Sequence, residues 1–88
     1  MKMSEGFELV NIAEEHLVVP VGEKADKVKG LIVVSPAAAF LLGKMKKDLT
    51  IDELVSLLTD HYNVSMDKAR EDIIEMVDTL RSMGLIID

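Results

Sequence analysis

The sequence predicts an α+β fold in which a three-stranded antiparallel sheet is followed by three α-helices. Three observations lead to this prediction. Short β-branched segments bounded by glycine precede every segment with helical periodicity. A serine or threonine that can cap a helix precedes each helical segment. The 88 residues, 49% of them hydrophobic, suffice for one modest core, so we expect residues 1–88 to form a single domain.

The predicted strands cover residues 7–12, 16–21 and 31–34. In the first strand, apolar and polar residues alternate until Val10 and Asn11 break the phase, which is typical of a strand with or without a bulge. Pro20 has no N–H to donate, so it must lie at a strand end or where its amide side is unpaired. Residues 22–30 are charged, glycine-bounded and without periodicity, which predicts a mobile loop or an extended wing.

The third strand is apolar throughout, with the sequence Leu31, Ile32, Val33, Val34. Successive side chains of a strand point to opposite faces, so one face meets the core and the other must also be covered. The cover is either the protein's own helix, a second subunit, or a peptide lying beside an open sheet edge.

The first two predicted helices begin at recognisable caps. Ser35 followed by Pro36 starts a helix to about residue 45, because the hydroxyl caps free amides and proline fits the first turn. Thr50 and Glu53 form a capping box that opens a second helix ending near Tyr62.

The last predicted helix is the longest, capped by Ser65 and ended by Gly84. One narrow apolar stripe runs along it, with Met76 and Met83 on one flank and Ile74 on the other. The stripe consists of Ala69, Ile73, Val77 and Leu80. The stripe and its flanks together form an apolar face that is wider than a small core needs. Either one edge of this face lines a groove, or the helix is wedged between a sheet and two helices. Residues 85–87 should pack against the rest of the domain as an extended C-terminal segment.

Composition and charge disfavour several classes of protein. The chain has no cysteine and no apolar run long enough to cross a bilayer, and its first six residues do not resemble a secretory signal, so we expect a cytoplasmic location. The net charge of −6 disfavours nucleic acid as a partner. His16 and His61 fall on different predicted elements without ligand spacing, and no nucleophile or phosphate-binding motif occurs. We therefore expect no catalytic site, no metal and no cofactor.

Four short motifs occur in a recognisable order. They are Ser35-Pro36-Ala37-Ala38 after the third strand, the run Leu49 to Val55, the tripeptide Tyr62-Asn63-Val64, and the run Leu80 to Ile86. Together they resemble the PqqD-like proteins, also called RiPP recognition elements, which bind leader segments of ribosomally made precursor peptides. The resemblance covers most of the chain. The sequence departs from the family in a longer charged stretch before Gly30 and in Lys47-Asp48, where the family usually has a glycine-containing turn.

The resemblance implies a winged-helix-like scaffold that does no chemistry of its own. It implies that an extended leader peptide binds beside the third strand, in a cleft completed by the last helix, and is delivered to a modifying enzyme, often a radical SAM protein. Strand addition would supply backbone hydrogen bonds, and apolar side chains would select the guest. The candidate peptide-binding residues are Leu31, Ile32, Val33, Val34, Arg70, Ile73, Ile74, Val77 and Arg81. Which flank of the last helix faces the strand is open.

Two other functions compete with peptide binding. Three helices with a small sheet can form a winged-helix DNA-binding module, but the last helix has more acidic than basic residues and would be repelled by phosphates. The third strand can also pair with its own copy, which would give a homodimer or a domain-swapped dimer.

Overall fold

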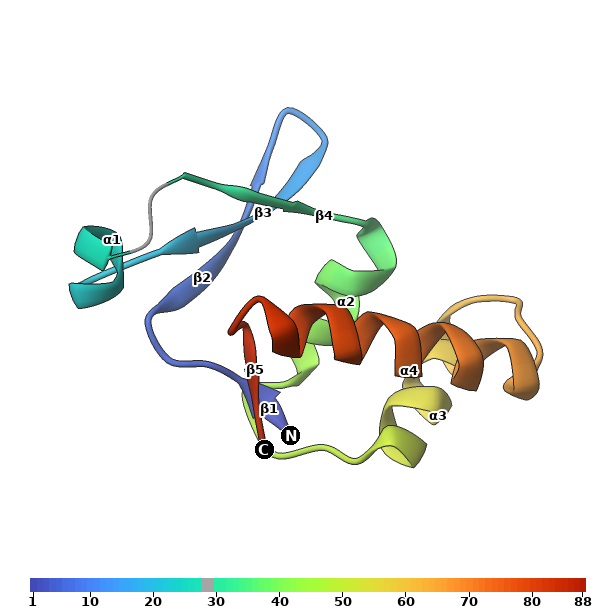
Figure 1. The fold of residues 1–88 in the computed structure, drawn as a ribbon. Helices are drawn as coiled ribbons and strands as arrows, with labels where there is room; N and C mark the ends of the chain where they lie inside the picture. Colours follow the sequence, from blue (N-terminus) through green and yellow to red (C-terminus); the bar gives the residue numbers. More distant parts are fainter. Residues whose placement is uncertain (28–29) are drawn as a thin grey trace.

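The computed structural model describes residues 1–27 and 30–88 of the chain. Its elements, in chain order, are β1 (Lys2–Met3), β2 (Phe7–Ile12), β3 (Glu15–Pro20), α1 (Glu23–Lys27), β4 (Ile32–Val34), α2 (Pro36–Lys44), α3 (Ile51–His61), α4 (Met66–Ser82) and β5 (Ile86–Ile87). Strands β2, β3 and β4 form one antiparallel sheet in that order, and β1 pairs with β5 in a second, two-stranded sheet. Figure 1 shows α4 running beneath the three-stranded sheet, with both termini beyond it. The predicted α+β fold is confirmed, and the structure adds α1 and the β1–β5 pair.

The β2–β3 hairpin is regular. Its residues pair one to one from Phe7 opposite Pro20 to Ile12 opposite Glu15, so β2 contains no bulge. The turn consists of Ala13 and Glu14, both with positive φ (50° and 70°), as a two-residue hairpin turn with the right-handed strand twist requires. The predicted strands at 7–12 and 16–21 leave three residues between them, whereas the observed connection has two and β3 begins at Glu15.

The charged segment at residues 22–30 differs from its prediction. Residues 23–27 form the short helix α1 instead of a loop or wing, and residues 28–29 lie outside the described part of the chain. No residue of α1 is buried. Because a helix without a buried face leaves no apolar stripe in the sequence, periodicity cannot reveal it.

All three predicted helix caps are present. The Ser35 hydroxyl accepts a hydrogen bond from the Ala38 amide (3.1 Å), and the Ser65 hydroxyl accepts one from the Lys68 amide (3.2 Å). Thr50 and Glu53 complete their capping box with two bonds of 3.1 Å, each side chain accepting from the other residue's amide. These bonds satisfy amides that have no partner within their helix.

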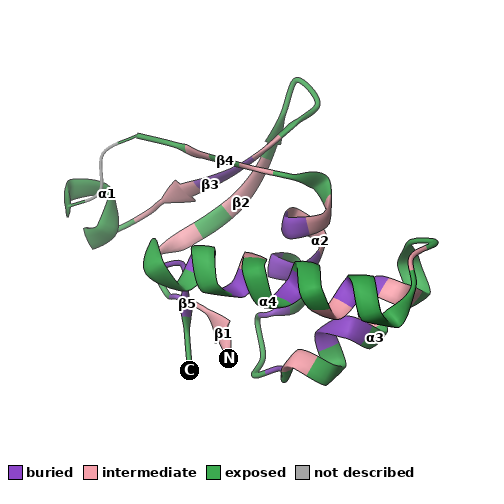
Figure 2. Ribbon diagram, turned by 45° about the vertical axis from the view of Figure 1, so that its right-hand side comes forward, coloured by how far each residue is buried: buried purple, intermediate pink, exposed green. Residues whose placement is uncertain are grey.

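The core lies between the sheet and the last three helices. The predicted stripe of α4 is buried, and Figure 2 shows buried residues where α4 meets α3 and exposed residues along the outer side of α4. Leu85 and Ile86 are buried as well, and β5 pairs with β1, so the predicted docking of residues 85–87 is confirmed. The Ser4 hydroxyl donates to the Gly84 carbonyl (2.8 Å) and fixes the turn into β5. Among the described residues, no helix has the length and apolar character that crossing a membrane requires.

Candidate functional site

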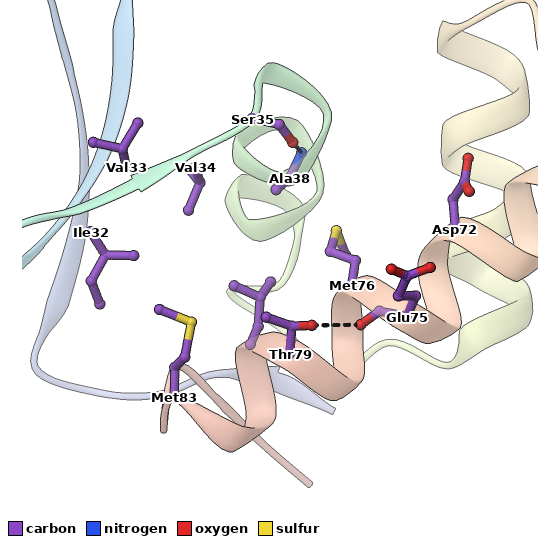
Figure 3. A pocket seen from close by; sticks show the side chains of 11 residues that line it. Ile32, Val33, Val34, Ser35, Ala38, Asp72, Glu75, Met76, Thr79 and Met83 are labelled. Carbon is purple, nitrogen blue, oxygen red and sulfur yellow. Dashed lines mark hydrogen bonds between the residues drawn. The ribbon is translucent and has the colours of Figure 1, made fainter.

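A groove of about 400 Å³ lies between β4 and α4. Its lining residues are Ile32, Val33, Val34, Ser35 and Ala38 on one side, and Asp72, Glu75, Met76, Thr79, Leu80 and Met83 on the other. Figure 3 shows Ile32 and Val34 pointing toward α4, while Met83 extends toward Ile32 and Met76 toward Ala38. The groove is therefore apolar at its centre, and its walls are made of flexible methionine and stiff β-branched side chains.

Side chains of β4 alternate between two environments. Ile32 and Val34 are half-buried and pack against the core, whereas Val33 points to the opposite face of the sheet and is 63% exposed. Leu31, just before the strand, is 59% exposed. The outer face of β4 thus presents apolar surface to solvent, which is unusual for an unpaired strand and typical of an interaction site.

The outer edge of β4 has no partner strand among the described residues. In the order β2-β3-β4, the last strand pairs with β3. An unpaired edge presents backbone N–H and C=O groups that another extended chain can bind.

The hydrogen-bond pattern shows which groups face that edge. The Val21 amide donates to the Gly6 carbonyl (2.8 Å), one register step beyond the pair Phe7–Pro20, so the Val21 backbone faces β2. Because backbone groups alternate sides along an antiparallel strand, His16 and Val18 face β4. Their register partners are Val34 and Ile32, which therefore direct their N–H and C=O groups toward β3. Val33 lies between them, so its N–H and C=O point out to the open edge.

The same alternation accounts for Pro20. Pro20 is the last residue of β3, and its nitrogen, which carries no hydrogen, faces the β4 side. Ile32, the first residue of β4, pairs with Val18, so β4 does not reach the level of Pro20. Pro20 therefore lies both at a strand end and at a position whose amide side is unpaired, as its missing N–H predicts.

The groove is acidic at one end. Asp72 and Glu75 line it where α4 is farthest from Met83 (Figure 3). The Lys68 Nζ lies 3.1 Å from an oxygen of Asp72, and the hydrogen bond to this carboxylate raises the pKa of Lys68. Glu75 makes no ion pair with any described residue. Its backbone carbonyl accepts a hydrogen bond from the Thr79 hydroxyl (3.0 Å), the contact drawn in Figure 3.

Comparison with known proteins identifies the family. A family model described as "Coenzyme PQQ synthesis protein D (PqqD)" matches residues 9–86. The chain belongs to this family. The resemblance to PqqD-like proteins that the motifs predict is thereby confirmed.

The fold of this PqqD-family chain also resembles a solved structure. It matches "TbiB1 in Complex with the TbiA(beta) Leader Peptide" with a TM-score of 0.74 and 14% sequence identity, over 100% of both chains. At this level of identity the match shows a shared fold. No match is found among curated proteins.

The structure settles which flank of α4 faces β4 in this PqqD-family protein. Met76 and Met83 line the groove, whereas Ile74, which is 52% exposed, does not. The other flank points elsewhere: the Arg70 guanidinium lies 2.7 Å from the Asp52 carboxylate on α3, and that of Arg81 lies 2.8 Å from Asp88.

The candidate residues from the sequence therefore fall into four groups. Ile32, Val33 and Val34 line the groove, and Leu31 lies just beyond its lining. Ile73 and Val77 are only 1% and 3% exposed and belong to the core, since they occupy the centre of the buried stripe of α4. Arg70, Ile74 and Arg81 lie on the flank that does not line the groove.

Sequence reasoning left several groove residues out of its candidate set: Asp72, Glu75, Met76, Thr79 and Met83. The two methionines carried a signal, because they form one edge of the wide apolar face of the helix. The carboxylates carried none, because they look like ordinary members of a solvated face.

Neither of the two histidines lines the groove. The His61 ring stacks on Phe40 with centroids 4.1 Å apart, and Tyr62 meets the Phe40 ring edge-on at 6.1 Å, so His61 is part of an aromatic cluster. In the described part of the chain, no three His, Cys, Asp or Glu side chains lie close enough together to hold a metal ion.

Proposed function

We propose that this chain is a non-catalytic binding module that captures the leader segment of a ribosomally made precursor peptide by strand addition at β4. The observation that carries the proposal is the open edge of β4, where the Val33 N–H and C=O point outward beside an apolar groove. An edge of this kind accepts an extended peptide as a fourth strand.

Backbone pairing and the groove would contribute differently to recognition. A guest residue that exchanges both hydrogen bonds with Val33 has its side chain on the Val33 face of the sheet. The guest residues on either side of it then point toward α4, into the groove between Ile32 and Met83. Backbone bonds supply affinity for any extended chain, and the groove selects among side chains.

The family and the fold support this proposal. The chain belongs to the PqqD family, and a protein of the same fold, TbiB1, has been solved in complex with a leader peptide. The modifying enzyme that receives the peptide is part of the proposal, with radical SAM proteins as the class that the family resemblance indicates. So are a cytoplasmic location and the action of residues 1–88 as one domain.

A homodimer is the second candidate, because the same edge can pair with a second copy of itself. The exposed apolar side chains of Leu31 and Val33 favour it. Light scattering separates the two functions. A monomer at concentrations where the peptide binds excludes edge pairing between copies under those conditions.

Titration calorimetry with the leader peptide encoded beside the gene tests the proposed function. We expect saturable, one-to-one binding with a negative heat-capacity change, since apolar surface is buried in the groove. A scrambled peptide of the same composition is the control. Equal binding of the native and scrambled leaders would contradict selective recognition, and no binding of either would contradict the proposal as a whole.

A further inference from the structure

The groove beside β4 has two chemically different ends. At the Met83 end, the facing side chains are apolar, with Met83 extending toward Ile32 (Figure 3). At the other end, α4 contributes Asp72 and Glu75. Asp72 is partly neutralised by Lys68 at 3.1 Å, whereas Glu75 has no ion-pair partner among the described residues.

The spacing along α4 can be compared with the spacing along a guest strand. A helix rises about 1.5 Å per residue, so Glu75 and Asp72 lie about 12 Å and about 16 Å along α4 from Met83. Side chains on one face of a strand are two residues apart, or about 6.6 Å. In a guest that runs alongside α4, a side chain level with Met83 is therefore followed by one about 6.6 Å away, level with Thr79, and then by one about 13 Å away, level with Glu75.

We propose that the groove selects an extended peptide with an apolar residue beside Ile32 and Met83 and a cationic residue four positions away, beside Glu75. The intermediate groove-facing residue is apolar, because it lies level with Thr79 and between the apolar side chains of Leu80 and Met76. This inference rests on the proposed strand addition at β4 and adds the class of guest sequence. Lysine and arginine suit the acidic end because their long apolar stems lie along the groove while the charge reaches the carboxylate.

Guest direction decides the order of these residues. Figure 3 shows β4 running from Ile32, on the Met83 side, toward Ser35, on the side of Met76 and Asp72. In a guest antiparallel to β4, the cation therefore precedes the apolar residues. In a parallel guest it follows them. Two synthetic peptides, Thr-Lys-Thr-Val-Thr-Ile-Thr and its reverse, with blocked termini, cover both directions. In the matched acidic probes, glutamate replaces lysine.

Amide shifts of the isotope-labelled protein, titrated with these four probes at about 0.15 M salt, measure both binding and its location. At this ionic strength the screening length is about 8 Å, which weakens attraction to carboxylates outside the groove. We expect the Val33 amide to shift, and the lysine probe of one direction to bind about threefold to tenfold more tightly than its glutamate counterpart. Glu75→Gln should remove most of this preference.

Asp78→Asn is the matched control, because it removes the same charge from α4 at an exposed position that does not line the groove. It should leave the preference for lysine unchanged. Equal binding of lysine and glutamate probes with a shifted Val33 amide would overturn the charge inference and leave strand addition standing. If Asp78→Asn and Glu75→Gln lost the preference for lysine equally, the preference would be an effect of net charge, and recognition of the cation by Glu75 would be overturned. No Val33 shift with any probe would overturn strand addition and the inference together.

Discussion

The substitution Val33→Pro tests strand addition directly. The Val33 N–H points to the open edge of β4, while the neighbouring residues Ile32 and Val34 form the hydrogen bonds to β3. Proline therefore removes a donor that a guest peptide would use and leaves the β3–β4 ladder complete. Edge strands tolerate proline at such outward positions.

The size of the effect follows from the exposure of the site. A backbone hydrogen bond contributes about 0.5–1.5 kcal/mol net, and a buried carbonyl left without a donor costs about 1–3 kcal/mol. Because Val33 is 63% exposed, water reaches this edge and would solvate part of the guest carbonyl that has lost its donor. We therefore expect leader-peptide affinity to fall about tenfold, equivalent to about 1.4 kcal/mol.

Calorimetry on wild type, Val33→Pro and Val33→Thr provides the measurement. Val33→Thr keeps the N–H and the β-branched shape, so its affinity should stay within about twofold of wild type. Thermal melts followed by circular dichroism establish that both variants are folded. If folded Val33→Pro bound the leader as tightly as Val33→Thr, the backbone-pairing mechanism would be refuted.

Three further predictions distinguish residues that line the groove, residues of the core and a helix-capping residue. Met83→Ser should weaken peptide binding about fivefold by removing apolar groove surface, whereas Ile74→Ser on the other flank should not change it; calorimetry reports both, and equal effects would contradict the groove assignment. Ile73→Val should cost about 0.5–1.5 kcal/mol of stability in urea unfolding while leaving the affinity of the folded protein intact; weaker binding would place Ile73 in the site. Thr50→Ala should cost about 1 kcal/mol and lower Tm by about 4–8 °C, whereas Thr50→Ser should not.

Much of the fold is predictable because its signals are local. The hydroxyls of Ser35, Thr50 and Ser65 mark helix starts by bonding amides three residues away, so the information lies within one helical turn. The buried stripe of α4 is equally local, because periodicity alone places its residues on one face.

The elements that prediction missed depend on contacts between distant segments. Strands β1 and β5 contain two residues each and pair across nearly the whole chain, with Lys2 opposite Ile87. A two-residue strand has no periodicity to detect. The helix α1 buries no residue, so nothing in its sequence distinguishes it from a charged loop.

The candidate site was predictable only in part, because one of its walls has a local sequence signal and the other depends on tertiary packing. The apolar run at residues 31–34 indicated that both faces of this strand need a cover, which made β4 a candidate for peptide binding. Which flank of α4 completes the groove depends on how the helix is rotated against the sheet, and both flanks carry apolar residues. The ion pairs of Arg70 and Arg81 belong to tertiary structure as well, since their partners lie on α3 and at the C-terminal end.

The position of Pro20 limits the length of the open edge of β4. With no N–H on the β4 side, β3 cannot extend its ladder through an amide at residue 20, and β4 is only three residues long. A guest strand added at β4 would therefore gain few backbone bonds, which favours rapid dissociation. Rapid dissociation suits the proposed delivery of the peptide to a modifying enzyme, because the module then becomes available for the next peptide.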